Sequence, residues 1–333
     1  MGVIGYGYWG PNLVRNLAEL DNAIVAMVCD QSEERCKAVA NRYPSVTTTT
    51  NANELIESAN IDAVVIATPV RSHFDLSLQA LKSGKHVLVE KPITQSADQA
   101  QILIEEADTR NLILMTDHTF LYTGAVRKIR DLIDSGELGD IYYYDSTRIN
   151  LGLFQHDVDV IWDLAIHDLS ILNFLLKQRP LAVSATGAAH ISGQVENVAY
   201  LTIYLEGGAI AHVNVNWMSP IKIRQTLIGG SKRMVVYDDL EPSEKIRVYD
   251  KGVTLTEDPE SVHQMLVGYR TGDMWAPQIS TREALQVEVE HFIECINTSG
   301  QPISDGRSGL EVVKIAEAAT QSMRRRGEPV EIG

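Results

Sequence analysis

Residues 1–11 read MGVIGYGYWGP, and this stretch decides the fold that the sequence predicts. An apolar segment runs directly into a glycine loop with the spacing Gly5-x-Gly7-x-x-Gly10, and Pro11 suits the first turn of a helix. In such a loop the glycines allow a tight turn, close approach of the backbone to a pyrophosphate, and close packing of helix on strand. The stretch therefore predicts a strand, a loop and a helix that bind a dinucleotide. The alternative is a glycine-rich turn that binds no nucleotide.

An acidic residue follows at the distance that dinucleotide sites use. The second apolar segment, residues 24–28, ends near Asp30, twenty residues beyond Gly10. A carboxylate there accepts hydrogen bonds from the adenosine ribose hydroxyls and repels a 2′-phosphate. NAD is therefore predicted as the cofactor rather than NADP.

Strand and helix patterns then alternate. A short segment at 46–50 and apolar segments at 63–67, 87–89 and 112–115 are separated by segments with helical spacing, such as Phe74, Leu78 and Leu81. This alternation predicts a doubly wound parallel sheet of about six strands, and hence an α/β fold class. We expect the nucleotide-binding domain to occupy residues 1–117.

The segment at 87–89 leads to the candidate catalytic amine. Residues 86–94 read HVLVEKPIT, and the strand stops at Glu90, Lys91 and Pro92. Open α/β sheets bind ligands at such strand ends. Pro92 lacks an N–H and biases Lys91 toward an extended backbone, so the lysine leaves the strand in a defined direction. The alternative is that Glu90 and Lys91 only begin a solvated loop.

The pattern changes in the second part of the chain. Residues 141–150 alternate as a strand does, with Ile141, Tyr143, Asp145, Thr147 and Ile149 on one face and Tyr142, Tyr144, Ser146, Arg148 and Asn150 on the other. The different chemistry of the two faces suggests that one of them binds a ligand. Strand-like segments at 198–205, 209–217, 221–228 and 234–237 follow one another with short turns. Residues 118–306 are therefore predicted to form an α+β domain with a large, mainly antiparallel open sheet.

Three other segments of this part differ from the strands. A helix is expected at 159–176, and segment 256–280 has no clear period. Helical spacing returns around 285–296 and 310–323.

The densest cluster of titratable residues is HDVDVIWDLAIHD, residues 156–168. On a helix, Asp159, Asp163 and His167 would lie four residues apart on one face. A carboxylate one turn before a histidine can fix its tautomer and raise its basicity, which suits proton transfer to or from a hydroxyl. The alternatives are a metal site and a structural cap or salt-linked helix. A metal is disfavoured because no second histidine stands at HxxxH spacing.

Composition excludes several classes of function. The formal net charge of -15 over 333 residues argues against a nucleic-acid or anionic-membrane partner. No signal peptide or long uninterrupted apolar stretch is found, so a cytoplasmic location is expected. Cys29, Cys36 and Cys295 show no CxxC spacing, which disfavours a disulfide framework or a cysteine zinc site.

These motifs together resemble one family, the glucose-fructose oxidoreductase / inositol dehydrogenase / MocA-like (Gfo/Idh/MocA) oxidoreductases. The resemblance rests on GYGYWGP at the start, ATPVRSH at 67–73, VEKPIT at 89–94, DLAIHDL at 163–169 and the closing helices. It implies a Rossmann domain followed by an open-sheet domain for substrate binding and oligomerisation, with the last helix, about 307–325, returning to the Rossmann domain. GYWGPNLVRN and NVNWMSPIKIR look most like the bacterial nucleotide-sugar 3-dehydrogenases, such as those acting on UDP-N-acetylglucosamine.

The resemblance also implies roles for single residues. The family's EKP lysine matches Lys91, and its Asp-xxx-His pair matches Asp163 and His167. His167 would then accept the proton of a substrate hydroxyl, oriented by Asp163, while Lys91 stabilises the oxygen as hydride leaves the carbon. The candidate cofactor contacts are Gly5, Gly7, Tyr8, Trp9, Gly10, Asp30, Thr68, Pro69, His73, Glu90 and Lys91. His73 could equally be a helix-start residue.

Candidate substrate contacts lie at strand ends or on the polar strand face. They are His118, Tyr122, Arg148 and Asn150, together with Asp163 and His167. Lys222 and Arg224 alternate on another strand toward which a diphosphate could point, because arginine suits phosphate contact. The alternatives are a solvated basic face for Lys222 and Arg224, and a satisfied core histidine for His118.

The leading hypothesis is an NAD-dependent dehydrogenase that oxidises a secondary hydroxyl of a sugar, cyclitol or nucleotide sugar. Its rivals are an oxidoreductase that retains its cofactor between turnovers, a non-catalytic dinucleotide-binding sensor, and a metal-dependent lyase. A broad sheet with one apolar face needs a cover, so a homodimer or homotetramer is expected.

Overall fold

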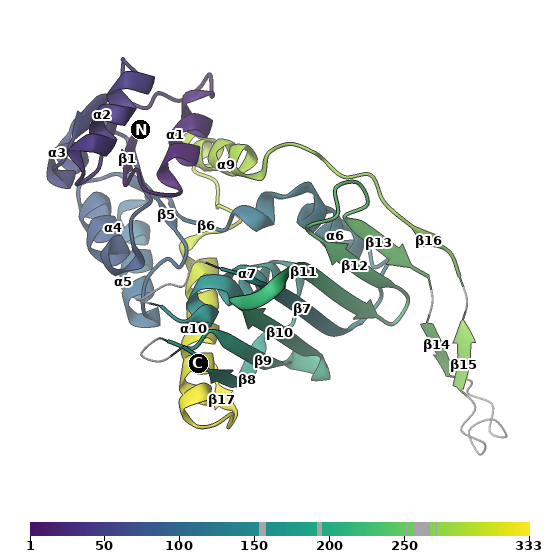
Figure 1. The fold of residues 1–333 in the computed structure, drawn as a ribbon. Coiled ribbons are helices and arrows are strands. Elements are labelled where there is room, and N and C mark those ends of the chain that lie inside the picture. The colour runs from purple at the N-terminus through teal and green to yellow at the C-terminus, as the bar shows by residue number, and fades with distance from the viewer. Residues whose placement is uncertain (153–157, 192–194, 251, 256–266, 271) are drawn as a thin grey trace. The chain divides into compact units, whose positions relative to one another are not determined.

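A computed structural model describes residues 1–152, 158–191, 195–250, 252–255, 267–270 and 272–333 of the chain. These residues divide into two compact units (Figure 1). Unit 1 comprises Met1–Thr123 and Arg282–Glu317, and unit 2 comprises Gly124–Thr281 and Ala318–Gly333. The expected boundaries at 117 and 306 differ from this division, in which residues 282–306 belong to unit 1.

Unit 1 contains a six-stranded parallel sheet in the order β3-β2-β1-β4-β5-β6. This confirms the predicted doubly wound sheet. Its strands are β1 (Gly2–Ile4), β2 (Met27–Cys29), β3 (Thr47–Thr49), β4 (Ala63–Ile66), β5 (His86–Glu90) and β6 (Leu114–Asp117). The central strands are continuous apolar runs because both faces of the sheet are covered, and all four residues of β4 are buried.

Helices connect and cover these strands. They are α1 (Gly10–Ala18), α2 (Glu33–Arg42), α3 (Ala52–Glu57), α4 (His73–Lys82), α5 (Ala97–Arg110) and α9 (Ala284–Thr298), with the 3-10 segments η1 (Val70–Ser72) and η2 (Thr119–Tyr122). Local chemistry fixes their ends: Pro11 stands in the first turn of α1, and the hydroxyl of Ser96 accepts from the N–H of Gln99 at the start of α5. α1 packs on α9, and α4 packs on α5.

Unit 2 contains a nine-stranded sheet in the order β16-β13-β12-β11-β7-β10-β9-β8-β17. Neighbouring strands are antiparallel except β7 and β10, which run parallel. The bounds are β7 (Ile141–Leu151), β8 (Pro180–Ala188), β9 (Val198–Leu205), β10 (Ile210–Asn216), β11 (Met218–Gly230), β12 (Met234–Asp238), β13 (Ile246–Tyr249), β16 (Met274–Trp275) and β17 (Val330–Glu331). The large, mainly antiparallel sheet that the sequence predicted is confirmed.

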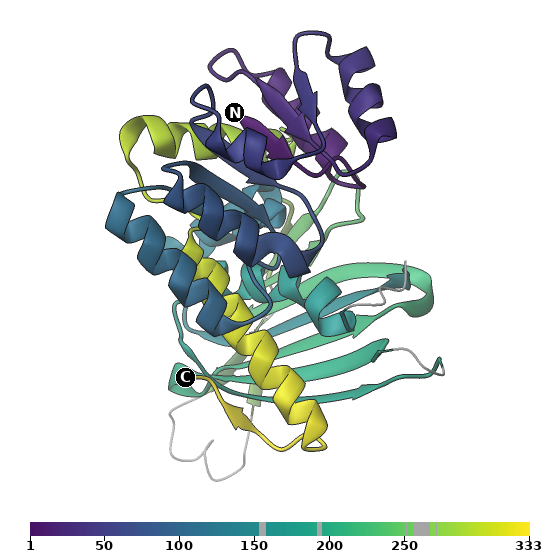
Figure 2. The same ribbon diagram turned by 90° about the vertical axis from the view of Figure 1, so that its left-hand side faces the viewer.

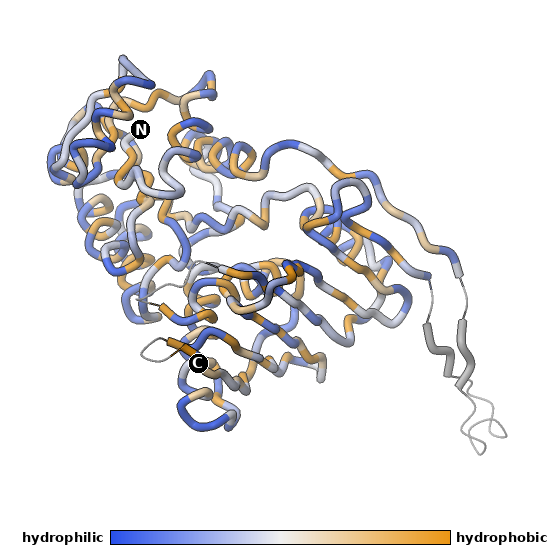
Figure 3. Tube along the Cα trace, in the orientation of Figure 1, coloured by the Kyte–Doolittle hydropathy of each residue, from blue (hydrophilic) through white to orange (hydrophobic). Residues whose placement is uncertain are grey.

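Alternation along these strands gives the sheet two different faces. In β9 and β10 every second residue is buried, and Figure 3 shows the matching alternation of hydrophobic and hydrophilic residues. The buried face lies toward α7 (Ile166–Leu175), which packs against β7 and α6 (Gly124–Asp134). A separate two-stranded sheet pairs β14 (Gly252–Leu255) with β15 (Val267–Arg270). Most of the rest of segment 256–280, at 256–266 and 271, lies outside the described residues.

The long helix α10 (Gly306–Arg324) contributes to both units. Figure 2 shows the chain turning back after α10 into β17, which pairs with β8 at the edge of the larger sheet. Within unit 2 the hydroxyl of Ser322 accepts from the N–H of Ala185 at 2.8 Å and donates to the carbonyl oxygen of Glu328 at 2.7 Å. No helix among the described residues is long and apolar enough to cross a membrane.

Candidate active site

The glycine loop of unit 1 has the shape of a pyrophosphate cradle. A Cβ on Gly5 would lie 2.3 Å from the carbonyl oxygen of Ala67, and one on Gly10 would lie 2.2 Å from that of Gly5. The backbone at position 5 also has a positive φ of 99°, which glycine adopts readily and other residues rarely do. Around Gly7, in contrast, the nearest atom to such a Cβ is Nη1 of Arg35 at 3.7 Å. Two glycines therefore serve packing, while the third leaves the backbone open to a bound pyrophosphate.

Asp30 fixes this loop to the end of β2. Its carboxylate accepts from the N–H of Tyr6 at 2.7 Å and from the N–H of Ser32 at 2.9 Å. Nη1 of Arg35 lies 3.4 Å from the same carboxylate. The side chain of Asp30 is 7% exposed. Its carboxylate follows β2, the position from which an acid binds the ribose hydroxyls of a dinucleotide in such sites. The residues present thus fit a dinucleotide.

The loops after β4 and β5 are joined through His73. Its Nε2 lies 2.8 Å from the carbonyl oxygen of Thr68, and its Nδ1 lies 2.8 Å from that of Pro92. His73 is also the first residue of α4, so the helix-start interpretation holds as well. Burial lowers the pKa of His73, although both carbonyl contacts act in the opposite direction. The ring therefore ties the Thr68-Pro69 turn to the turn that contains Lys91.

Lys91 follows the last residue of β5 beside buried acids. Glu90 is in register with Asp117 at the end of β6, and its Oε2 accepts from the N–H of Lys91 at 3.1 Å. Burial raises the pKa of Glu90 well above its ordinary value, and the charge of Asp117 raises it further, whereas Lys91 acts in the opposite direction. Asp117 also accepts from Nε1 of Trp9 at 3.2 Å. Trp9 is thereby held by the sheet, while Tyr8 beside it is 87% exposed.

Glu288 on α9 completes this acidic group and was not among the residues predicted from the sequence. The residue is fully buried, and burial raises its pKa well above the ordinary value, with a further contribution in the same direction from the charge of Asp117. The sequence pattern could have indicated this residue, because Glu288 interrupts the apolar helical face formed by Leu285, Val289 and Phe292. A charged residue on the buried face of an amphipathic helix needs a partner.

The two other candidates of unit 1 differ from each other. The hydroxyl of Tyr122 lies 2.9 Å from Oγ of Ser304 and the side chain is buried, so that hydroxyl has an internal partner. His118 is 1% exposed, and neither of its ring nitrogens has a hydrogen-bond partner among the residues that the structure describes. Burial lowers the pKa of His118 to about 3, and Lys91 lowers it further. A neutral imidazole with open nitrogens is suited to contact a bound molecule.

In unit 2 the expected helix 159–176 is interrupted at its start. Residues Ile161–Ala165 form a π-helical segment, η3, before α7 begins. Asp159 precedes both and caps them: its Oδ1 accepts from the N–H groups of Ile161 at 2.9 Å and Trp162 at 3.1 Å. Asp159 is thus a capping residue, as the structural alternative had it, and the N–H of Asp163 donates to its carbonyl oxygen at 3.1 Å, one helical turn further on. Burial raises the pKa of Asp159 to about 6. His156 lies outside the described residues.

Asp163 and His167 lie on consecutive turns of this segment. The carboxylate of Asp163 accepts from Nε1 of Trp217 at 3.0 Å, and Trp217 is 1% exposed. Trp217 connects β10 to β11 and was not among the sequence-predicted residues. The sequence could have indicated Trp217 only through its place between two predicted strands, because the N–H of a buried indole needs a hydrogen-bond acceptor.

The remaining candidates of unit 2 lie on β7 and β11. Arg148 is buried in an ion pair with Asp168, with Nε 2.6 Å from Oδ2. Asn150 is half-buried, and Lys222 is exposed. Nη1 of Arg224 lies 3.3 Å from Oδ2 of Asp239.

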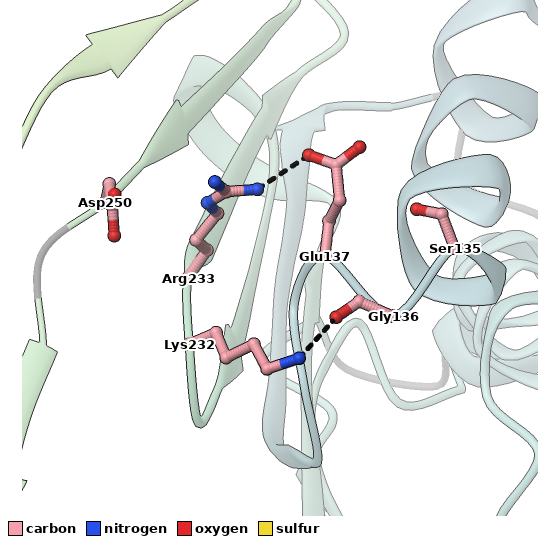
Figure 4. A pocket seen from close by; sticks show the side chains of 6 residues that line it. All are labelled: Ser135, Gly136, Glu137, Lys232, Arg233 and Asp250. Carbon is pink, nitrogen blue, oxygen red and sulfur yellow. Dashed lines mark hydrogen bonds and ion pairs between the residues drawn. The ribbon is translucent and has the colours of Figure 1, made fainter.

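A hollow of about 330 Å³ also lies in unit 2, lined by Ser135, Gly136, Glu137, Lys232, Arg233 and Asp250 (Figure 4). Arg233 contacts Glu137 at 2.7 Å, and Nζ of Lys232 donates to the carbonyl oxygen of Gly136 at 3.2 Å. None of the candidate site residues lines this hollow. The described residues also contain no group of three or more His, Cys, Asp or Glu side chains that could hold a metal ion.

Family models match both parts of the chain. Residues 1–118 match the GFO/IDH/MocA model described as "Oxidoreductase family, NAD-binding Rossmann fold", and residues 126–236 match the GFO/IDH/MocA C-terminal domain.

Several relatives are similar over nearly the whole chain. UDP-N-acetylglucosamine 3-dehydrogenase of Acidithiobacillus ferrooxidans is 28% identical, and the alignment covers 95% of this chain and 94% of that protein. A solved structure of that name and organism has a TM-score of 0.81, is 26% identical and covers 97% of both chains. The scyllo-inositol 2-dehydrogenase (NAD(+)) of Bacillus subtilis is 26% identical and covers 100% of this chain and 94% of that protein.

A further solved structure, an oxidoreductase from Agrobacterium radiobacter in complex with NAD+, L-tartaric acid and magnesium, has a TM-score of 0.81 at 20% identity. It covers 100% of this chain and 98% of that chain. At this identity the likeness concerns the fold.

Proposed function

We infer that this chain, which belongs to the Gfo/Idh/MocA family of oxidoreductases and binds NAD in its Rossmann domain, oxidises a secondary hydroxyl at C3 of a nucleotide sugar. UDP-N-acetylglucosamine is the first candidate, because the relative named for that substrate is 28% identical over 95% of this chain. The coarser activity, dehydrogenation of a sugar or polyol, follows from the family. Position C3 and the nucleotide are the proposal.

The position of Lys91 supports the dehydrogenase chemistry in this proposal. The lysine follows β5, which is two strands from β1 and its glycine loop in the sheet order. Both strands end at the same edge of a parallel sheet, so an amine after β5 and a pyrophosphate at the glycine loop belong to one ligand-binding edge. His118 follows β6 at that edge. Its ring nitrogens have no hydrogen-bond partner among the residues that the structure describes, which supports the presence of a bound molecule there.

The proposed roles follow from the chemistry of each side chain. Bound NAD supplies a hydride acceptor. His167 accepts the proton of the substrate hydroxyl, and Asp163 holds the imidazole in the tautomer that can do so. Lys91 donates a hydrogen bond to the same oxygen and stabilises the negative charge that develops on it. The substrate carbon thus loses a hydride and its oxygen loses a proton, which leaves a ketone.

A substrate screen tests the proposal. NAD reduction is followed with UDP-sugars, free hexoses and inositols at equal concentration. We expect reduction with UDP-N-acetylglucosamine at a kcat/KM well above that for any free sugar. Reduction only with free polyols would replace the nucleotide sugar by an inositol, the substrate in the name of a relative that covers the whole chain. NAD binding without turnover of any of these substrates would instead support the alternative of a non-catalytic dinucleotide-binding sensor.

Two further parts of the proposal concern assembly and location. The outer face of the larger sheet carries Tyr143, Tyr204 and Ile210, which are 41%, 39% and 46% exposed. Ile210 pairs in register with both tyrosines, so the three form one row across β7, β10 and β9. This row supports a homodimer or homotetramer formed through the sheet face. The three cysteines form no disulfide, in keeping with a cytoplasmic enzyme.

A further inference from the structure

A buried ion pair lies directly beneath the turn that carries His167. Asp168 is the next residue, and its Oδ2 accepts from Nε of Arg148 at 2.6 Å while its Oδ1 lies 3.3 Å from Nη2. Oγ of Ser146 donates to the same Oδ1 at 2.6 Å. The side chains of Arg148 and Asp168 are 4% and 2% exposed. Such a bidentate contact fixes orientation as well as distance.

The backbone of this turn is held by the same strand. The hydroxyl of Tyr144 donates to the carbonyl oxygen of Asp168 at 3.2 Å. Tyr144, Ser146 and Arg148 are alternate residues of β7 and therefore share its inward face. One face of one strand thus contacts both the side chain and the main chain of Asp168.

The preceding segment explains why such an anchor is needed. The π-helical residues Ile161–Ala165 end one residue before α7 begins, and a π turn contains an extra residue relative to an α turn. The rotational position of the first turn of α7 is therefore not set by continuation of a regular α-helix. On the N-terminal side Asp163 is held by Trp217 at 3.0 Å, and on the C-terminal side Asp168 is held by Arg148.

We propose that Arg148 and Asp168 are the positioning pair of His167, which set the direction of its imidazole, and that Arg148 does not contact the substrate. This inference rests on the proposed role of His167. It reassigns Arg148 from the substrate contacts expected from the alternation of β7. Nε and Nη2 of the guanidinium contact Asp168 on α7, and a buried ion pair of this kind is costly to break in favour of a ligand.

The test compares Arg148→Met with the double variant Arg148→Met/Asp168→Asn. The single variant leaves a buried carboxylate without its cation, so we expect a clear fall in Tm. The double variant removes both charges, so its Tm returns toward that of the wild type. If the pair positions His167, kcat of the double variant stays reduced, by about 100-fold, because small misplacements of a reacting group have effects of that size. KM for the substrate and Kd for NAD stay within about twofold of the wild type, because in this proposal the pair contacts neither the substrate nor the cofactor.

A measurement without turnover separates this proposal from the proposed function. The imidazole NMR signal of His167 is assigned by its loss in His167→Asn, and its titration midpoint and shift are compared between variants. We expect both to change in the double variant and to stay unchanged in Thr147→Ser, which alters the opposite face of β7. Ser146→Ala, which removes one neutral contact to Asp168, is the milder probe if the charge variants do not fold, and should move the signal in the same sense.

The outcomes are distinct. A kcat that recovers together with Tm in the double variant would make the pair purely structural and overturn the proposal. An increase in KM for the substrate with kcat unchanged would make Arg148 a substrate contact. Full activity of His167→Asn would defeat the proposed function, while the NMR comparison would still report whether the pair orients the ring.

Discussion

Lys91 and His167 are the residues on which the proposed chemistry depends. We expect Lys91→Met and His167→Asn each to lower kcat by about 10²–10⁴-fold, the usual contribution of a positioned acid, base or oxyanion partner. Kd for NAD should stay within about threefold, because uncharged replacements of similar size leave the glycine loop and Asp30 in place. Steady-state kinetics and NAD titration by fluorescence check both. Lys82→Met, an exposed lysine of α4, is the matched control. Undiminished kcat in either active-site variant would refute its assigned role.

Cofactor choice is a second property that single residues decide. Asp30 disfavours a 2′-phosphate, but Nη1 of Arg35 lies only 3.4 Å from its carboxylate and stands ready to bind one. We expect Asp30→Ser to move the ratio of kcat/KM for NADP to that for NAD by about 10–100-fold toward NADP, since one charge contact near a surface contributes about 1.5–3 kcal/mol.

The double variant Asp30→Ser/Arg35→Ala tests the cause. It should lose most of the gained NADP activity, and Arg35→Ala alone should leave the NAD activity near that of the wild type. A gain that survives removal of Arg35 would assign the selectivity to repulsion by Asp30 alone. Because Asp30 also holds the N–H of Tyr6, Tm of each variant is measured alongside.

At the scale of elements, α9 brings Glu288 into contact with the ends of β5 and β6. Burial and Asp117 raise the pKa of Glu288 from an ordinary value of 4.5. A carboxyl with a raised folded pKa holds a proton that the unfolded chain releases, so it makes the protein less stable as pH rises above about 4.5.

Glu288→Gln removes this penalty, because a neutral amide of similar size replaces the ionisable carboxyl. We expect Tm of the variant to exceed that of the wild type by about 2–4 °C per kcal/mol removed at neutral pH, with the difference vanishing toward acid pH. Thermal unfolding across a pH series checks it. Glu294→Gln on the same helix, whose side chain is 73% exposed, should show no such pH-dependent gain. Parallel Tm–pH curves for Glu288→Gln and wild type would contradict the assignment.

The elements also show what sequence can and cannot predict here. Alternation located β9 and β10 nearly to the residue, because period-two burial on a half-covered sheet is a local signal. The spacing of the glycines predicted the loop for the same reason. The contacts of Asp168 with Arg148 and of Asp163 with Trp217 join residues 20 and 54 positions apart, and no local period reports such pairs. The π segment at Ile161–Ala165 was not predicted either, because helical spacing assumes a regular α-helix.

At the scale of the whole molecule, the outer sheet face should bury the row of Tyr143, Ile210 and Tyr204 against a second copy of the chain. Stable interfaces bury about 1,600 Å² in total, and a strand-crossing apolar row is the kind of centre that such interfaces need. We expect Ile210→Lys to lower the molar mass measured by size-exclusion chromatography with light scattering at matched concentration. A buried ammonium without a partner costs several kcal/mol, or about two to three orders of magnitude in Kd.

Ile24→Lys is the matched control for this prediction, because Ile24 is 78% exposed and belongs to unit 1, away from the sheet face. Its molar mass should equal that of the wild type, which separates a specific effect from the general effect of one more positive charge on a chain of net charge -15. A monomeric wild type, or an Ile210→Lys variant with unchanged mass, would remove the sheet face as the site of self-association. Retained NAD binding by dissociated Ile210→Lys would place the cofactor site within a single chain.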